Sequence, residues 1–161
     1  MTMHNLPGVL SPPLPEGPWR GWSSWTGHEP FEELVGPFYT RRETDGSYTT
    51  GFRPSERNLN STGILHGGAI ATFADYTLFM IAFGAVQGRP SVTATLNTEF
   101  LRAGRTATLL TGRGDVLRTT RSLVFVRGLI TSEDAPVVSF SGVIKFINGR
   151  GFTATSTPAS A

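Results

Sequence analysis

The longest apolar stretch of the chain covers residues 69–83, and its apolar side chains fall on every side of a helical projection. Gly67 and Gly68 stand directly before this stretch, and a Gly-Arg-Pro sequence at residues 88–90 prevents a helix from continuing beyond it. A helix that is apolar all round must be covered on all sides. The pattern therefore predicts one long buried helix from Gly67 to about Gly84.

The chain after Pro90 alternates between apolar and polar residues, as strands do. The apolar face of the first predicted strand, residues 91–101, carries Val92, Ala94, Leu96 and Phe100. Further strands are predicted at residues 106–117, 122–131 and 136–147. Their connectors, near residues 104–105, 119–120 and 133–135, are short, so we expect successive strands to be antiparallel neighbours.

The segment before the long helix predicts a short helix and a hairpin. Pro30 and two acidic residues begin a helix over residues 31–35, which the following Gly-Pro sequence ends. Residues 38–42 and 48–52 then form two strands around a turn that contains Asp45-Gly46. One helix with about six mostly antiparallel strands indicates an α+β fold, in which a curved sheet wraps around the central helix.

We divide the chain into one domain, residues 28–147, and two flanking segments. Residues 1–27 are rich in proline, glycine and serine and are predicted to form an irregular arm. All three tryptophans belong to it, and we expect them to pack on the domain or on a partner subunit, with a lid over a pocket as the alternative. They are Trp19, Trp22 and Trp25. Residues 148–161 are predicted to be disordered.

Composition narrows the classes of function. The 161 residues are 39% hydrophobic, and the longest apolar run is too short to cross a bilayer, so we expect neither a disordered nor a membrane protein. A net charge of +2 is too weak to require nucleic acid as a partner. No charged and apolar leader opens the chain, which predicts a cytoplasmic location. The absence of cysteine excludes disulfides and thiolate nucleophiles, and three histidines without cysteine predict no metal site; no cofactor is expected.

The start of the long helix is the first candidate for chemistry. Gly67 and Gly68 each disfavour a helix by up to about 1 kcal/mol, but they allow another molecule to approach the backbone. The amide groups of a first helical turn lack helical acceptors and suit a carbonyl oxygen that becomes negative during attack. Both glycines are therefore candidate substrate contacts. Close packing of the helix on a strand is the alternative, and the glycines by themselves favour it.

Asp75 lies in the middle of this apolar helix. A buried carboxylate costs several kcal/mol unless it is paired or hydrogen-bonded, so Asp75 is a candidate general base or nucleophile with a raised pKa. A structural carboxylate paired with an arginine is the alternative. Gly67 and Asp75 would lie about 12 Å apart along a helix, too far to flank one carbonyl carbon. If both serve one site, Asp75 comes from a second subunit, which predicts a two-fold homodimer.

The sequence around these residues resembles the PaaI-type hotdog thioesterases. The matching motif consists of Asn60, the sequence Gly-Ile-Leu-His-Gly-Gly at residues 63–68, and Asp75. The similarity extends over about residues 31–147. The resemblance implies a hotdog fold, a homodimer or a tetramer of two dimers, and hydrolysis of an acyl-CoA thioester to a free acid and CoA.

The resemblance also implies roles for individual residues. The Gly67 amide would polarise the thioester carbonyl, and Asp75 of the opposite subunit would activate water or attack directly. Asn60 would help to hold the thioester or the water. Thr93, where relatives carry serine, would orient the water, and His66 would shape the loop and assist.

Arginine is the candidate contact for the CoA phosphates. Lys145 is the only lysine among the fourteen basic residues, and arginine binds phosphate in a bidentate fork, although codon usage would also explain the bias. Arg118 and Arg121 are the candidates for phosphate contacts. Solvated strand ends would explain them equally, and residues 119–120 replace a glycine that is common in relatives.

Two other functions stay open on the same fold. A non-catalytic acyl-CoA binding or sensing module would share the pocket, but it gains nothing from an unpaired buried acid, so Asp75 and Asn60 favour an enzyme. A hotdog hydratase is less favoured, because nothing in the chain resembles its usual aspartate-histidine pair.

Overall fold

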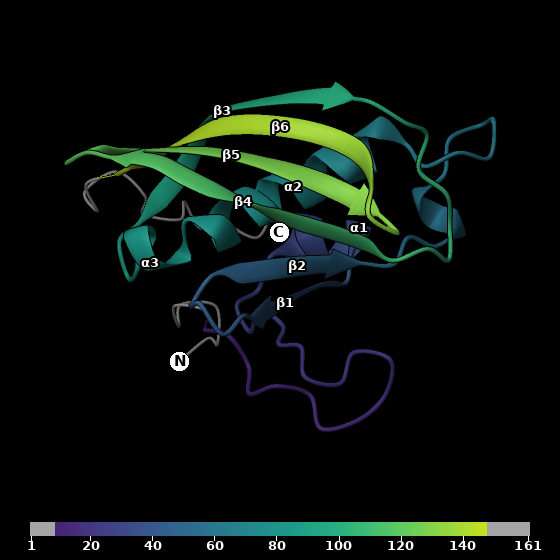
Figure 1. Cartoon of the computed structure of the whole chain (residues 1–161), viewed down its shortest axis with the longest axis horizontal. Coiled ribbons are helices and arrows are strands. Elements are labelled where there is room, and N and C mark those ends of the chain that lie inside the picture. Colours follow the sequence, from purple (N-terminus) through teal and green to yellow (C-terminus); the bar gives the residue numbers. More distant parts are fainter. Residues whose placement is uncertain (1–8, 148–161) are drawn as a thin grey trace, which may run out of the picture.

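A six-stranded sheet curves around one long helix in the computed structural model, which describes residues 9–147 (Figure 1). The helices are α1 (Pro30–Val35), α2 (Gly67–Ile81) and α3 (Phe83–Val86). The strands are β1 (Phe38–Arg42), β2 (Tyr48–Phe52), β3 (Ser91–Phe100), β4 (Leu110–Thr119), β5 (Leu123–Ser132) and β6 (Ala135–Phe146). All neighbours are antiparallel in the order β1-β2-β4-β5-β6-β3. The predicted α+β architecture, a curved sheet around a central helix, is confirmed.

Strand β3 does not pair with β4, and the prediction from the short connector was wrong on this point. β3 forms one edge of the sheet and pairs with β6, whereas β4 lies between β2 and β5. Strand β4 begins at Leu110 rather than at residue 106, so the connector is longer than expected and crosses the end of the sheet (Figure 1). The Leu65 amide donates to the Gly104 carbonyl at 3.1 Å. This bond ties the connector to the loop before α2, so the connector does not form a β3–β4 hairpin.

The alternation of β3 is interrupted as well. The pairing with β6 shifts register between Thr93 and Thr95. Val92 and Phe100 are 37% and 53% exposed, while Thr93 is half-buried and bonded to α2. The shift therefore divides the predicted apolar face of this strand: Leu96 packs against the core, whereas Val92 is turned away from it.

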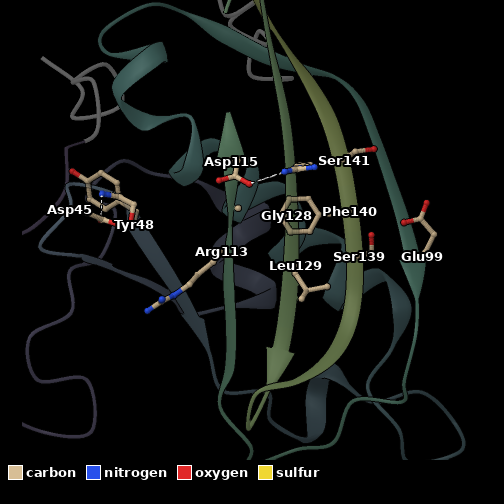
Figure 2. Close-up of a pocket in the computed structure, with 13 residues that line it drawn as sticks. Asp45, Tyr48, Glu99, Arg113, Asp115, Gly128, Leu129, Ser139, Phe140 and Ser141 are labelled. Carbon is tan, nitrogen blue, oxygen red and sulfur yellow. Dashed lines mark hydrogen bonds and ion pairs between the residues drawn. The ribbon is translucent and has the colours of Figure 1, made fainter. Parts of the chain in front are cut away.

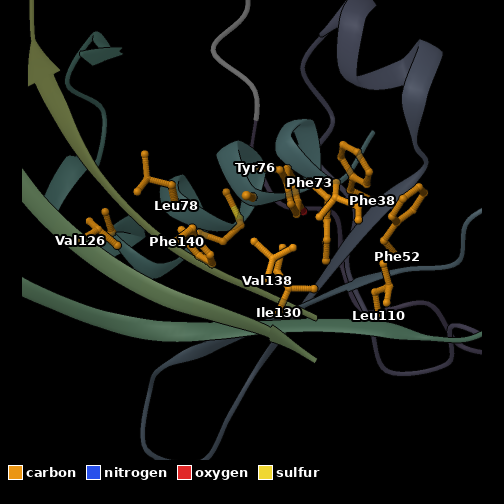
Figure 3. Close-up of a cluster of buried hydrophobic side chains, with 14 of the residues drawn as sticks. Phe38, Phe52, Phe73, Tyr76, Leu78, Leu110, Val126, Ile130, Val138 and Phe140 are labelled. Atoms are coloured by element: carbon orange, nitrogen blue, oxygen red, sulfur yellow. The ribbon is translucent and has the colours of Figure 1, made fainter. Parts of the chain in front are cut away.

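The core lies between α2 and the concave face of the sheet (Figure 3). Helix α2 has buried residues on each of its turns, which confirms the predicted buried helix, although it ends at Ile81 and α3 follows after a break. The largest fully buried side chains are Phe52, Phe73, Phe140, Leu78, Leu110, Ile130 and Ile144. No helix within residues 9–147 is long and apolar enough to span a bilayer.

Glycines on the concave face let α2 approach the sheet closely. A Cβ at Gly142 in β6 would lie 2.7 Å from the Thr95 carbonyl oxygen and 2.8 Å from Leu78 Cδ1. A Cβ at Gly112 in β4 would lie 2.7 Å from Thr77 Cγ2. These distances are shorter than real Cβ contacts, so any side chain at either glycine would push the helix away from the sheet.

The tryptophans at residues 19 and 22 pack on the β1–β2 hairpin, as one of the two sequence interpretations predicts. Trp19 stacks on Tyr39 with ring centroids 4.2 Å apart, and Trp22 is only 7% exposed. Both rings lie over Gly51, where a Cβ would come within 2.6 Å of Trp19 and 2.8 Å of Trp22. The Arg41 guanidinium lies 4.8 Å from the Trp22 ring centroid. The arm is thus anchored on the outer side of the hairpin.

We expect Gly142→Ala to lower the free energy of unfolding by about 1–3 kcal/mol, because the new methyl group must displace a backbone carbonyl or the helix. Gly84→Ala is the matched control, since a Cβ at Gly84 meets nothing within 4 Å. Its effect should be neutral, or stabilising by up to about 1 kcal/mol. Urea unfolding of the two variants tests this, and equal effects would contradict the close packing of α2 on β6.

Candidate active site

A cavity of about 840 Å³ lies beside the middle of α2. Its apolar wall comes from α2, α3 and the start of β3, and includes Phe79, Met80, Phe83, Val86 and Val92. A few polar side chains also line the cavity, among them Asp75, Thr93 and Glu32. An apolar cavity with a few convergent polar groups is typical of a site for a small molecule.

Asp75 lines this cavity with a half-buried carboxylate. Its Oδ1 accepts a hydrogen bond of 2.6 Å from the Thr93 hydroxyl of β3. Burial raises the pKa of Asp75 above its ordinary value, and the Thr93 bond opposes this rise. Within residues 9–147 Asp75 forms no ion pair, so the alternative of a carboxylate paired with an arginine does not hold. One oxygen of the carboxylate is left to meet a water molecule or a substrate.

The two glycines at the start of α2 differ in whether their backbone amides are hydrogen-bonded. The Gly68 amide donates to His66 Nδ1 at 2.9 Å, so His66 caps the helix and this donor is occupied. The Gly67 amide has no acceptor among residues 9–147. A Cβ at Gly67 would lie 3.3 Å from the Phe100 ring, so close packing also favours glycine there. Gly67 is therefore the helix-start donor that is open to a ligand.

Asn60 shapes the loop that leads into α2. Its Oδ1 accepts hydrogen bonds from the amides of Thr62 and Ile64 at 2.9 and 3.2 Å, and from the Thr62 hydroxyl at 2.7 Å. The Asn60 amide also donates to the Ile64 carbonyl at 2.8 Å. The side-chain NH₂ of Asn60 has no acceptor among the described residues, so it is the part of the side chain that is left for a ligand.

The predicted site residues form two groups within one chain. Thr93 joins Asp75 at the cavity, while Asn60, His66 and Gly67 lie together at the start of α2. Two turns of α2 separate the groups, as the spacing predicts.

The two predicted phosphate contacts belong to neither group. Arg118 is exposed in β4 and Arg121 is exposed in the β4–β5 turn, and neither lines the cavity.

Two residues of the cavity were missed by sequence analysis. Glu32 of α1 is half-buried, and burial together with the acidic neighbours Glu29 and Asp75 raises its pKa to about 7. Tyr76 is 3% exposed, and its hydroxyl is buried without a hydrogen-bond partner among the described residues.

The hydropathy pattern contains no signal for Glu32. It favours burial of Phe31 and Leu34, the apolar residues of α1, yet they are 66% and 69% exposed. Tyr76 follows Asp75 directly in α2, but in an apolar helix a tyrosine is indistinguishable from an ordinary core residue.

The arm closes one side of the same cavity. Val9, Leu10 and Trp25 line it, and a β-bridge between Leu10 and Trp25 holds these parts of the arm together. The alternative interpretation of the arm as a cover over a pocket therefore describes the parts around residues 9–10 and Trp25. Its middle, with Trp19 and Trp22, packs on the hairpin.

A second cavity of about 720 Å³ lies over β3–β6 and the hairpin turn, and contains none of the predicted site residues (Figure 2). Each of the two arginines in its lining is paired with an acidic side chain. Arg127 meets Asp115 at 3.4 Å, and Arg113 meets Glu43 at 3.2 Å. The described residues also contain no cluster of three or more histidine or acidic side chains that would hold a metal ion. The cavity beside Asp75 is the better candidate for catalysis.

The fold is that of the hotdog thioesterases, and PaaI proteins are among its structural neighbours. The family model of the thioesterase superfamily matches residues 62–139. A Pseudomonas aeruginosa protein named "Putative esterase PA0474" is 30% identical over 115 residues, which cover 71% of this chain and 86% of that protein. The chain belongs to the thioesterase superfamily, and its class is that of a thioester hydrolase.

Solved structures share the same fold. The PaaI protein of the E. coli phenylacetic acid degradation operon is 23% identical with a TM-score of 0.57, covering 63% of this chain and 73% of that one. A PaaI mutant from Thermus thermophilus is 20% identical with a TM-score of 0.63, covering 74% and 100%. A hypothetical thioesterase protein of Streptococcus pneumoniae, solved with coenzyme A, is 21% identical with a TM-score of 0.61, covering 69% and 86%.

We expect Glu32 to make stability fall as the pH rises. Because its pKa is raised from 4.5 to about 7, the folded protein keeps a proton that the unfolded chain has lost. This contribution is complete below about pH 4.5 and is lost as the pH rises through about 7. Glu32→Gln cannot ionise, so urea unfolding between about pH 5 and 8 should show a smaller fall in the free energy of unfolding. The exposed Glu56→Gln serves as control, and an equal fall in both variants would contradict the burial of Glu32.

Proposed function

We propose that the protein hydrolyses acyl-CoA thioesters to a free acid and CoA, at sites that two subunits share. The observation that carries this proposal is the half-buried Asp75 carboxylate, which faces a largely apolar cavity and is bonded only to Thr93 among the described residues. Family membership supports the thioester as substrate, and the coenzyme A in the Streptococcus pneumoniae structure supports CoA as the thiol. The cytoplasmic location stays a prediction.

The proposed mechanism uses Asp75 and Gly67 on opposite sides of the thioester carbonyl. The Gly67 amide donates to the carbonyl oxygen and stabilises its negative charge during attack. Asp75 takes a proton from water, and the resulting hydroxide attacks the carbonyl carbon. The carbon–sulfur bond then breaks, and the CoA thiolate recovers the proton. Attack by Asp75 itself would instead expel the CoA thiolate and form a mixed anhydride; water then hydrolyses the anhydride, and the thiolate takes up the proton released.

The remaining predicted residues would support these two groups. Thr93 holds one oxygen of Asp75 and leaves the other to face water. His66 and Asn60 order the loop at the start of α2 by accepting hydrogen bonds from backbone amides, and the Asn60 NH₂ would donate to the thioester or to water. The Gly68 amide would be free for a substrate only after its hydrogen bond to His66 breaks. Gly68 would therefore contribute to substrate binding mainly by its small size. Arg118 and Arg121 stay candidates for the CoA phosphates.

Two observations support a shared site. Gly67 and Asp75 stand two helical turns apart on α2, so a second chain is needed to bring both to one carbonyl. Strand β3 is an edge strand with exposed apolar side chains, Val92 and Phe100, which a second copy would cover. A two-fold dimer would contain two equivalent sites, and a tetramer of two such dimers would leave each site intact.

We expect Asp75→Asn to lower kcat for acyl-CoA hydrolysis by about 10²- to 10⁴-fold, because the amide cannot accept a proton from water. The assay follows thiol release from a panel of acyl-CoAs of different chain length. Asp115→Asn is the control, since that carboxylate is exposed on β4 and lies outside the cavity. Unchanged turnover in Asp75→Asn would refute the role of Asp75.

The same assay separates the enzyme from its alternatives. Binding of acyl-CoA without thiol release by the unaltered chain would favour a sensing module. A single turnover in heavy-oxygen water distinguishes the two mechanisms, since only direct attack places an oxygen of Asp75 in the product acid.

The shared site predicts complementation between two inactive variants. Gly67→Pro removes the amide donor, and proline suits the first position of a helix. The His66 backbone, at φ −65° and ψ 134°, already has a conformation that precedes proline. Neither Gly67→Pro nor Asp75→Asn should hydrolyse substrate alone. A refolded equal mixture should recover about a quarter of the original activity, because half of the dimers are mixed and each has one intact site.

Absence of recovery in this mixture, with mixed dimers shown by two affinity tags, would contradict a site built from both subunits. Activity of Gly67→Pro alone would instead remove the Gly67 amide from the mechanism.

A further inference from the structure

Two polar side chains of the cavity have no place in the proposed mechanism. Glu32 and Tyr76 both line the cavity, from α1 and α2. Tyr76 is only 3% exposed, and its hydroxyl has no hydrogen-bond partner among the described residues. The Glu32 carboxylate likewise forms no hydrogen bond or ion pair within residues 9–147. Buried polar groups without partners are rare in folded proteins and call for a water molecule or a ligand.

The two groups lie close enough to affect each other, and their chemistry is complementary. The Glu32 charge raises the pKa of Tyr76, and burial contributes the larger part of that rise. Ring contacts hold Tyr76 in place, with the Phe38 ring centroid 5.3 Å away. One group is a hydroxyl that can donate, and the other is a carboxylate that accepts. Together they would satisfy a ligand group that both donates and accepts, or one that only donates.

The charge around the cavity is negative. Among the described residues that line it, three are acidic, Glu29, Glu32 and Asp75, and Arg89 is the only basic one. The Arg89 guanidinium lies 3.3 Å from the Phe146 ring centroid and donates to the Arg121 carbonyl at 2.8 Å. Arg89 is therefore held at the rim by these two contacts. A carboxylate that entered the cavity would meet like charges, and no described residue of the lining offers a free cation opposite.

We propose that Glu32 and Tyr76 form a recognition point for the far end of the acyl group. It favours an acyl group that carries a hydrogen-bond donor and disfavours one that ends in a carboxylate. Discrimination of this kind arises because a substrate without the matching group leaves buried polar atoms unpaired, and because a second anion is repelled. This inference rests on the proposed function, since it assigns the cavity to the acyl group.

The test compares three six-carbon substrates: hexanoyl-CoA, 6-hydroxyhexanoyl-CoA and adipyl-CoA. The readout is the ratio of kcat/KM values within one variant, which general damage to the fold would leave unchanged. At pH 8, above the raised pKa of Glu32, Glu32→Gln should raise the ratio of adipyl-CoA to hexanoyl-CoA by roughly tenfold, because the like charge is gone. Tyr76→Phe should lower the ratio of 6-hydroxyhexanoyl-CoA to hexanoyl-CoA by about fivefold, the effect of one neutral hydrogen bond.

Glu56→Gln is the control, because this exposed residue lies outside the cavity and should leave both ratios as they are. Hydrolysis with both ratios unchanged in Glu32→Gln and Tyr76→Phe would overturn the inference and leave the proposed function standing. No thiol release from any of the three substrates would overturn both. If Glu32→Gln does not fold, Tyr76→Phe still decides, because it keeps the aromatic ring in the core.

Discussion

Contact between α2 and the concave face of the sheet is the interaction on which the other features depend. The helix is apolar on almost all sides, so it is stable only while the sheet covers it, and the sheet curves around it. Glycines at residues 112 and 142 remove the side chains that would separate the two layers. The same contact fixes the position of Asp75 relative to Thr93, because Asp75 lies on the helix and Thr93 lies on the edge strand. Packing therefore sets the position of the carboxylate, and no ion pair is needed.

The proposed mechanism divides the chemistry between the middle and the start of this helix. Asp75 is in a half-buried, apolar setting that raises its pKa, which suits a group that must take up and release a proton. At the helix start, His66 and Asn60 occupy the neighbouring donors and order the loop, so that the Gly67 amide is held in one direction. In the proposed mechanism neither group acts on a thioester without the other, which is why the proposal requires a dimer.

Much of this could be predicted from the sequence, and the failures have physical causes. The buried helix and its half-buried carboxylate follow from periodicity, since a long apolar helix with one acid leaves few alternatives. The position of β3 did not follow, because strand order depends on where a connector crosses the sheet, and alternation alone carries no such information. The shift between Thr93 and Thr95 is likewise invisible in the pattern. Glu32 was missed because α1 buries an acid and exposes Phe31 and Leu34, contrary to the usual preference.

The arm has a consequence for how such a protein can diversify. Its Val9, Leu10 and Trp25 form part of the cavity wall, yet its anchoring rings at residues 19 and 22 sit on the outer side of the hairpin, away from the contact between helix and sheet. Changes in the length or composition of this segment can thus resize the cavity without disturbing the packing of α2 on the sheet. Separate parts of the chain determine which molecules fit the cavity and how the fold is held together. The arm can therefore vary while the packing of helix on sheet is kept.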